Sequence, residues 1–249
     1  MSLFWKATEN QEAEQMEFSK RRYRHIFFDL DRTLWDFETN SMNALHDIFM
    51  KYKLKEFVPD FDAFLDAYNK HNEMLWHAFR HKQISKNELR VTRFYNTLKS
   101  FGVKDQALAE KIDQDYIYTN SRKTGLLPFT LEVLEYLNKD YRLHIITNGF
   151  REVQYIKLRQ SGLMPFFDKI FTSDEVGSQK PDALVFRNAL STVNARKKES
   201  LMIGDELYID ILGAREFGID QVFFNYHQVP HHEEVTYEVH CLSELKAFL

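Results

Sequence analysis

The sequence predicts an α/β fold in which a parallel sheet is interrupted by a long helical insertion. An apolar run at 25–28 comes first, the stretch 36–124 then shows only helical spacing, and strands alternate with helices after Pro128. Strands separated by helices of about 10–15 residues are typical of right-handed βαβ units, and hence of a parallel sheet. The first strand therefore belongs with the later strands, and the helical stretch is inserted between them.

The elements follow in order along the chain. Residues 1–22 are polar and form an N-terminal lead-in, while the run at 25–28 suits a strand buried on both faces. Helical spacing places the helices of the insertion at 39–54, 60–81, 85–101 and 105–121. The later strands are expected at 143–147, 169–172, 201–204 and 221–225, and the later helices at 130–139, 151–161, 182–194, 206–217 and near 242–248. The predicted domains are the lead-in 1–22, an α/β core made of 23–35 and 125–249, and a helical domain at 36–124.

The composition is that of an ordinary globular protein. Of 249 residues, 44% are hydrophobic and 28% are charged, which excludes a disordered or fibrous chain. The net charge of −4 disfavours a nucleic-acid polymer as partner. The one cysteine, Cys241, forms no internal disulfide, and no stretch approaches the ~20 apolar residues of a membrane span. We expect a soluble cytoplasmic protein without a membrane partner, and the sequence leaves its oligomeric state open.

Four polar segments lie where strands of this sheet end or in the loop that follows a strand. They are 29–33, 147–149, 179–181 and 204–210. Each alone is common turn or helix-cap chemistry. Ligands of open α/β sheets bind in the crevice at the carboxyl ends of the strands, so the four segments are expected to converge there. Their joint occurrence predicts a functional site at that edge.

The residue types at these positions indicate phosphoryl transfer. Of Asp29 and Asp31, one carboxylate can attack as a nucleophile while the other moves a proton. Asp205 adds a third negative group, and such clusters bind a hard cation, most often Mg²⁺. Lys180 supplies the counter-charge, and the Thr147 hydroxyl, with backbone N–H groups at the start of the next helix, suits a phosphate. Positioning and charge neutralisation carry most of the catalysis in this chemistry.

These motifs resemble those of the haloacid dehalogenase (HAD) superfamily of phosphatases. The matching residues are Asp29-x-Asp31-x-Thr33 for the first motif, Thr147 for the second, Lys180 for the third, and Gly204-Asp205 with Asp210 for the fourth. The resemblance covers about residues 24–228 and identifies the helical stretch as a cap inserted after the first motif. It implies a flavodoxin-like, doubly wound core and Mg²⁺ dependence.

The resemblance also implies individual roles. Asp29 would be the nucleophile that forms an aspartyl-phosphate, and Asp31 the general acid and base, with Lys180 completing the catalytic set. The metal ligands would be Asp29, the backbone carbonyl of Asp31, and Asp205. Phosphate would be bound by Thr147, Asn148 and Lys180, with Thr33, Glu206 and Asp210 in support.

Two further segments indicate which class of phosphate ester is the expected substrate. Residues 145–150 and 161–168 are similar to those of bacterial pyrimidine 5′-nucleotidases, which implies a nucleoside 5′-monophosphate as the small-molecule phosphate ester. The alternatives are a sugar-phosphate phosphatase like the N-acylneuraminate-9-phosphatases, a phosphoglucomutase-like enzyme and, outside enzymes, a non-catalytic phosphate-ligand sensor. Asp31 favours a phosphatase over a dehalogenase, because an alkoxide leaving group needs a proton. Arg32 and Glu206 depart from the common family pattern without removing a required group.

Aromatic and basic side chains near the cap are the candidates for substrate recognition. Each of them either contacts the substrate or packs a core, and packing is favoured for any single residue. The candidates are Trp35, Phe37, Trp76, Phe79, Arg80 and Arg93. His77 and His81 lack the glutamate of a zinc-protease motif, so we interpret them as surface histidines.

Overall fold

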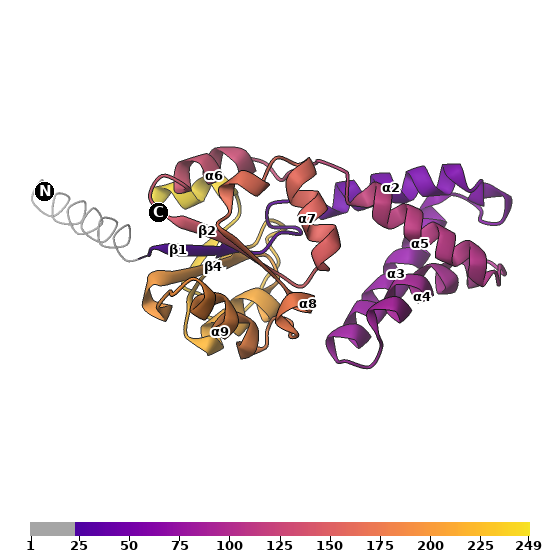
Figure 1. Cartoon of the computed structure of the whole chain (residues 1–249). Helices are drawn as coiled ribbons and strands as arrows, with labels where there is room; N and C mark the ends of the chain where they lie inside the picture. Colours follow the sequence, from indigo (N-terminus) through magenta and orange to yellow (C-terminus); the bar gives the residue numbers. More distant parts are fainter. Residues whose placement is uncertain (1–22) are drawn as a thin grey trace, which may run out of the picture. The chain divides into compact units, whose positions relative to one another are not determined.

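The computed structural model describes residues 23–249, so the predicted lead-in at 1–22 lies outside the described residues. The chain divides into two compact units, an α/β unit and a helical unit. In Figure 1 the helical unit is the one that carries the labels α2, α3, α4 and α5. Among the described residues, the α/β unit contains 23–36 together with Leu126–Leu249, and the helical unit contains Phe37–Gly125. We describe each unit by itself.

Within residues 23–249, six parallel strands form one sheet in the order β3-β2-β1-β4-β5-β6. Their bounds are β1 His25–Phe28, β2 Arg142–Thr147, β3 Lys169–Thr172, β4 Ser200–Gly204, β5 Asp220–Phe224 and β6 Tyr237–Val239. The first strand is central: its last residue, Phe28, lies opposite Ile145 on one side and Ile203 on the other. The predicted parallel sheet is confirmed. Because β1 lies between β2 and β4, the residues that follow β1 begin near the middle of the sheet's carboxyl edge.

Helices cover both faces of this sheet. Their bounds are α6 Thr130–Leu137, α7 Arg151–Gln160, α8 Ser173–Val176, α9 Ala183–Thr192 and α10 Leu212–Phe217. Figure 1 shows α6 and α7 on one face and α8 and α9 on the other. The buried core between sheet and helices includes Phe27, Ile146, Phe186 and Met202. This is the doubly wound arrangement that the sequence predicts.

Four details of the α/β unit differ from the prediction. The expected helix at 206–217 begins with a π-helical turn, Leu207–Ile211, and the expected last helix is a 3₁₀ segment, Leu242–Ala247. The short elements α8 and β6 were not predicted. Four- and three-residue elements are too short to show a hydrophobic period, and pairing with β5 is what orders β6.

The helical unit is built from four helices and one 3₁₀ turn. They are α2 Phe37–Lys51, η1 Leu54–Glu56, α3 Phe61–Arg80, α4 Lys86–Lys99 and α5 Gln106–Asn120. Helix α4 starts at a capping box in which Ser85 and Glu88 bond each other's backbone N–H groups. Asp60 and Asp105 cap α3 and α5 with one bond each, since their carboxylates accept from the Ala63 and Leu108 N–H groups.

Two of the candidate recognition residues pack into cores instead. Trp35 is fully buried in the α/β unit. Arg93 is buried in the helical unit, where its Nη2 lies 3.1 Å from Asp113 Oδ1 and its guanidinium carbon 5.0 Å from the centre of the Tyr116 ring. A buried cation needs such a partner, because removing it from water is costly. The packing interpretation is therefore confirmed for Trp35 and Arg93.

The chain passes between the two units twice, near 36 and near 125, and hydrogen bonds within each unit hold these two points close together. In the α/β unit, the Leu127 N–H donates to the Leu34 carbonyl at 3.0 Å, and Trp35 bridges to Leu126. In the helical unit, the Asn40 side chain donates to the Gly125 carbonyl at 2.8 Å and accepts from the Gly125 N–H at 3.1 Å. The insertion thus leaves and re-enters the α/β unit at neighbouring points.

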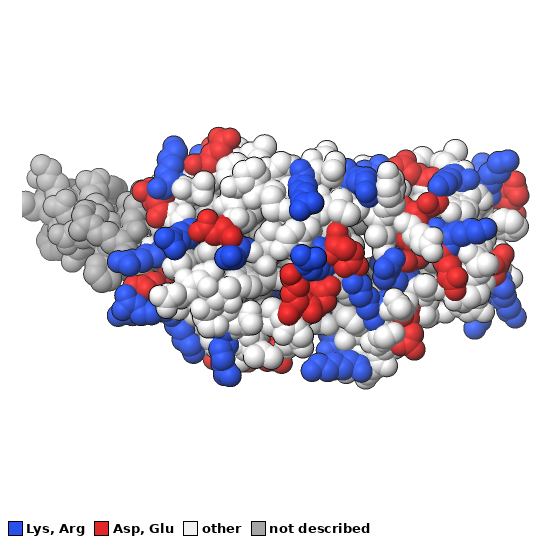
Figure 2. Space-filling view, viewed as in Figure 1, with Lys and Arg blue, Asp and Glu red and all other residues white. Residues whose placement is uncertain are grey.

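The surface carries charges of both signs. On the face shown in Figure 2, lysine and arginine side chains are interspersed with aspartate and glutamate on both units. In the described part of the chain, no helix combines the length and the apolar character that a membrane span requires.

Candidate active site

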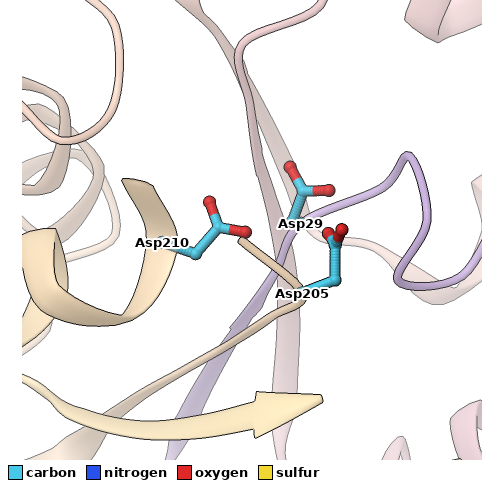
Figure 3. A group of neighbouring side chains, drawn as sticks. All are labelled: Asp29, Asp205 and Asp210. Atoms are coloured by element: carbon cyan, nitrogen blue, oxygen red, sulfur yellow. The ribbon is translucent and has the colours of Figure 1, made fainter. Parts of the chain in front are cut away.

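Three aspartates converge at the carboxyl edge of the sheet, as Figure 3 shows. Asp29 directly follows β1, Asp205 directly follows β4, and Asp210 lies in the π-helical turn after it. One carboxylate oxygen of each lies within 4.8 Å of the others. The Asp29 N–H donates to the Ile203 carbonyl at 2.9 Å, which extends the pairing of β1 with β4 to the point where Asp29 turns into the site.

A buried lysine is paired with two of these aspartates. Lys180 Nζ lies 2.5 Å from Asp29 Oδ1 and 2.7 Å from Asp210 Oδ1, and it donates to the Ile146 carbonyl at 2.7 Å. The loop that carries Lys180 is held by Asn148, whose side chain donates to the Lys180 carbonyl at 3.0 Å and accepts from its N–H at 2.8 Å. The Asn148 side chain thereby ties the end of β2 to the loop of Lys180, and the predicted phosphate contact of Asn148 stays a prediction.

The electrostatics of the cluster favour a bound cation. Burial raises the pKa of Asp29 to about 7, although the Lys180 cation offsets part of the rise. Burial, followed by the charges of Asp29 and Asp210, raises the pKa of Asp205 well above its ordinary value. Burial alone would lower the pKa of Lys180, but Asp210 and Asp29 outweigh it and raise that pKa. Lys180 is paired with Asp29 and Asp210 but not with Asp205, so a further positive charge would stabilise the ionised form of these carboxylates.

The donor set fits a hard divalent cation such as Mg²⁺, because it consists of carboxylate oxygens. Of the predicted ligands, Asp29 and Asp205 are in the cluster. Asp210, predicted to be a supporting residue, is the third member. The Asp31 carboxylate lies elsewhere, and the Asp31 backbone carbonyl implied by the resemblance stays a prediction.

The predicted supporting residues order the fourth motif. Thr33 Oγ1 donates to Asp205 Oδ1 at 3.1 Å, and the Glu206 N–H donates to Asp210 Oδ2 at 3.3 Å, while the Glu206 side chain is exposed. Gly204 leaves room for Asp210, since a Cβ at position 204 would lie 2.3 Å from Asp210 Oδ2. The absence of a side chain at position 204 is therefore required by Asp210, which lies in the π-helical turn after β4.

The Asp31 side chain has its own partners, which sequence reasoning missed. Lys157 Nζ lies 2.5 Å from Asp31 Oδ1, and Gln154 Nε2 donates to Asp31 Oδ2 at 2.8 Å. Gln154 also donates to Thr147 Oγ1 at 3.1 Å. Burial lowers the pKa of Lys157, and the Asp31 charge opposes that effect. The available signal was a glutamine and a lysine three residues apart in the helix after the Thr-Asn-Gly segment.

Arg32 adopts a backbone conformation that is unusual for its residue type. Its φ of 68° lies in the left-handed region, and its N–H donates to the Trp35 carbonyl at 2.9 Å. The residues on either side of this turn, Asp31 and Thr33, both contact residues of the site: Asp31 contacts Gln154 and Lys157, and Thr33 donates to Asp205. The Arg32 charge lowers the pKa of Asp205, against the larger effects that raise it.

A doubly wound sheet that gathers three aspartates and a lysine at its carboxyl edge defines an α/β enzyme with an acidic centre. A sequence model of the family described as haloacid dehalogenase-like hydrolase matches residues 26–224. The chain therefore belongs to the haloacid dehalogenase-like hydrolase family, as the motif resemblance predicts.

Relatives of known name are similar along almost the whole chain. The pyrimidine 5′-nucleotidase PynA of Streptococcus pneumoniae is 36% identical over 228 residues, which is 90% of this chain and 93% of that protein. The pyrimidine 5′-nucleotidase YjjG of Escherichia coli is 30% identical over 227 residues, covering 90% of this chain and 96% of that protein. The two together make the chain a HAD-type phosphatase.

A solved structure supports the same assignment. The putative HAD-hydrolase YfnB of Bacillus subtilis, determined with bound magnesium, superimposes with a TM-score of 0.83 at 31% sequence identity. The match covers 91% of this chain and 98% of that chain.

Proposed function

We propose that this protein is a Mg²⁺-dependent phosphatase that releases phosphate from nucleoside 5′-monophosphates through an aspartyl-phosphate on Asp29. The observation that carries the proposal is the placement of Asp29 at the end of the central strand, paired with Lys180 and within 4.8 Å of two further aspartates. The similarity to two pyrimidine 5′-nucleotidases supports the choice of substrate. A cytoplasmic location stays a prediction from the sequence.

In the first half of the proposed reaction, an Asp29 oxygen attacks phosphorus. The bond between phosphorus and the ester oxygen breaks as the bond to Asp29 forms, and Asp31 gives a proton to the departing 5′-oxygen. The Lys180 ammonium, 2.5 Å from Asp29, offsets the negative charge that gathers on the attacking and transferred groups. The Thr147 hydroxyl, which lies at the end of β2, holds a phosphoryl oxygen.

In the second half, water replaces the carboxylate on phosphorus. Asp31, now ionised, takes a proton from the water as it attacks, and the phosphorus–oxygen bond to Asp29 breaks to release phosphate. Bound by Asp29, Asp205 and the neighbouring carboxylate, Mg²⁺ would supply charge neutralisation that lets an anionic ester approach an acidic site. Asp31 serves both halves because its carboxylate lies outside the acidic cluster.

Phosphate release from a panel of nucleoside 5′-monophosphates and sugar phosphates, with Mg²⁺ and with EDTA, tests the proposal. We expect release that requires Mg²⁺ and is fastest with pyrimidine nucleoside 5′-monophosphates. A preference for sugar phosphates would retain the mechanism and overturn the substrate. Silence across the panel, with phosphate still bound in the presence of Mg²⁺, would favour the sensor over the enzyme.

A further inference from the structure

One face of α7 reaches the site through two buried polar side chains. Gln154 and Lys157 are three residues apart, so they lie on the same side of the helix. They are only 1% and 2% exposed, and the Lys157 ammonium lies 4.0 Å from the centre of the buried Trp35 ring. Buried polar and charged groups are destabilising unless they are paired. Here their partners are two residues of the proposed active site.

The first partner is Asp31, and it is held by both oxygens. Lys157 binds Oδ1 at 2.5 Å, and Gln154 donates to Oδ2 at 2.8 Å. These two contacts fix the plane of the carboxylate, because each oxygen is tied to a different side chain of one rigid helix. About a fifth of the Asp31 side chain, 21%, stays exposed for contact with a substrate or water.

The second partner is the Thr147 hydroxyl. Its oxygen accepts one hydrogen bond from Gln154 Nε2 and one from the Gly149 N–H, both at 3.1 Å. A hydroxyl group has two acceptor positions and one hydrogen to donate. With both acceptor positions used, the hydroxyl hydrogen is directed away from these donors and is available to a phosphoryl oxygen.

The Gln154 amide occupies the space that a side chain at position 149 would need. A Cβ at position 149 would lie 1.6 Å from Gln154 Nε2 and 2.5 Å from its Cδ. No side chain at that position is compatible with the observed amide. The glycine of the Thr-Asn-Gly segment and the glutamine five residues later therefore form one structural unit.

We propose that Gln154 and Lys157 are positioning residues, which orient Asp31 for proton transfer to the leaving 5′-oxygen and Thr147 for donation to the phosphoryl group. The inference rests on the proposed function and deepens it. Neither side chain touches the reacting atoms: each acts through the residue that it holds. The contribution is geometric, and it is greatest for the step in which a poor leaving group needs a proton.

The dependence on leaving group separates this role from a general structural one. p-Nitrophenolate departs without a proton, whereas the 5′-alkoxide of uridine 5′-monophosphate needs one. The value of kcat/KM reports on steps up to the loss of the leaving group, so it isolates the acid role of Asp31. We expect Lys157→Met and Gln154→Met each to lower kcat/KM for uridine 5′-monophosphate by about 10- to 100-fold. The ratio of this kcat/KM to that for p-nitrophenyl phosphate should fall by at least about 5-fold.

Matched variants on the same helix serve as controls. Arg159→Met and Gln160→Met change exposed residues of α7 to the same side chain and should leave the ratio as it is in the unaltered enzyme. Gly149→Ala should reproduce the effect of Gln154→Met, because the new Cβ would displace the Gln154 amide while the glutamine itself is retained. If Lys157→Met fails to unfold cooperatively on heating, Gln154→Met and Gly149→Ala carry the test.

The outcomes are distinct. Parallel losses for the two esters, with the ratio unchanged, would overturn the positioning role and leave the phosphatase proposal intact. Absence of activity on both esters in the unaltered enzyme would overturn the proposed function, and this inference with it. A ratio that falls in the Gln154, Gly149 and Lys157 variants but not in the controls would support the inference.

Discussion

Asp29 and Asp31 are separated by one residue, yet their side chains have different surroundings. Asp29 is buried beside Lys180 and the aspartates that follow β4, whereas Asp31 is held by two side chains of α7. The strained turn at Arg32 follows directly. Because of this divergence, one carboxylate can serve as the nucleophile within the acidic cluster, while the other is held outside that cluster in an orientation suited to proton transfer.

Replacing the proposed nucleophile should remove activity without unfolding the protein. Asp29→Asn keeps the size of the side chain but not its nucleophilic oxygen, so we expect kcat to fall by more than about 10³-fold. Steady-state phosphate release measures the loss, and circular dichroism checks the fold. Turnover near that of the unaltered enzyme would assign the nucleophile elsewhere.

The raised pKa of Asp29 gives the metal-free protein a pH-dependent stability. The folded-state pKa of about 7 lies above the ordinary value of 3.8, so the folded chain binds this proton more tightly than the unfolded chain does. In EDTA, the free energy of unfolding should therefore decrease as pH rises from about 4 to 7, by at most about 1.4 kcal/mol per pH unit for this one proton.

Denaturant unfolding in EDTA at several pH values measures this slope. Asp29→Asn has no titrating group at that position, so its slope should be smaller by the contribution of one proton. In the proposed site Mg²⁺ would bind the ionised carboxylates, so its stabilising effect should increase with pH over the same range. An equal slope in Asp29→Asn would contradict the assignment to Asp29.

At the scale of elements, strand ends and the turns after them set the site. Two glycines, Gly149 and Gly204, stand where a Cβ would collide with Gln154 or Asp210. Gly149 lies in the connection after β2, and Gly204 is the last residue of β4; in each case the polar residue lies on the helical element that follows. Because the glycine has no side chain, a polar side chain of the following helical element can pack against the end of the preceding strand: Gln154 does so at β2 and Asp210 at β4.

Gly204→Ala tests this at the fourth motif. The new Cβ would lie 2.3 Å from Asp210 Oδ2 and 2.6 Å from Asp210 Cβ, so the turn must shift. We expect a loss of about 1–3 kcal/mol in the free energy of unfolding, as for other overpacked sites, together with weaker Mg²⁺ binding. A double-mutant cycle with Asp210→Gly is the control: the cost of Gly204→Ala should be smaller in that background. Equal costs in the two backgrounds would rule out Asp210 as the cause.

Most of the fold and much of the site were predictable because they depend on local pattern. An apolar run ends where Asp29, Thr147 or Asp205 begins, and the carboxyl edge of a parallel sheet brings such positions together. Lys157 was not predictable, because sequence patterns place lysine at the surface and only tertiary contact with Asp31 and Trp35 explains its burial. The length and pairing of β6 depended on tertiary contact in the same way.

At the scale of the whole molecule, the chain consists of an α/β unit that contains the proposed chemical groups and a helical unit inserted between β1 and β2. Every residue of the acidic cluster, together with Lys180, Gln154 and Lys157, belongs to the α/β unit. The hydrophobic cluster that contains Phe27 and Met202 is likewise made of residues from that unit alone. We propose that the two units are separate folding domains.

Removal of the insertion tests this division. Since Leu34 pairs with Leu127 and Trp35 with Leu126, a short glycine-serine linker can replace 37–125 without stretching the chain. We expect the remaining α/β unit to unfold cooperatively on heating and to gain thermal stability from Mg²⁺. Calorimetry with and without Mg²⁺ measures these two properties. Non-cooperative unfolding would show that the α/β unit depends on the insertion.

The neighbouring entry and exit points of the insertion also bear on how such a chain can change over generations. A segment whose ends are already held together by Asn40 and Gly125 on one side, and by Leu34 and Leu127 on the other, can be lengthened, shortened or exchanged by recombination while the flanking fold keeps its geometry. Descendants of one ancestral gene can therefore keep the same acidic cluster while their inserted units diverge independently.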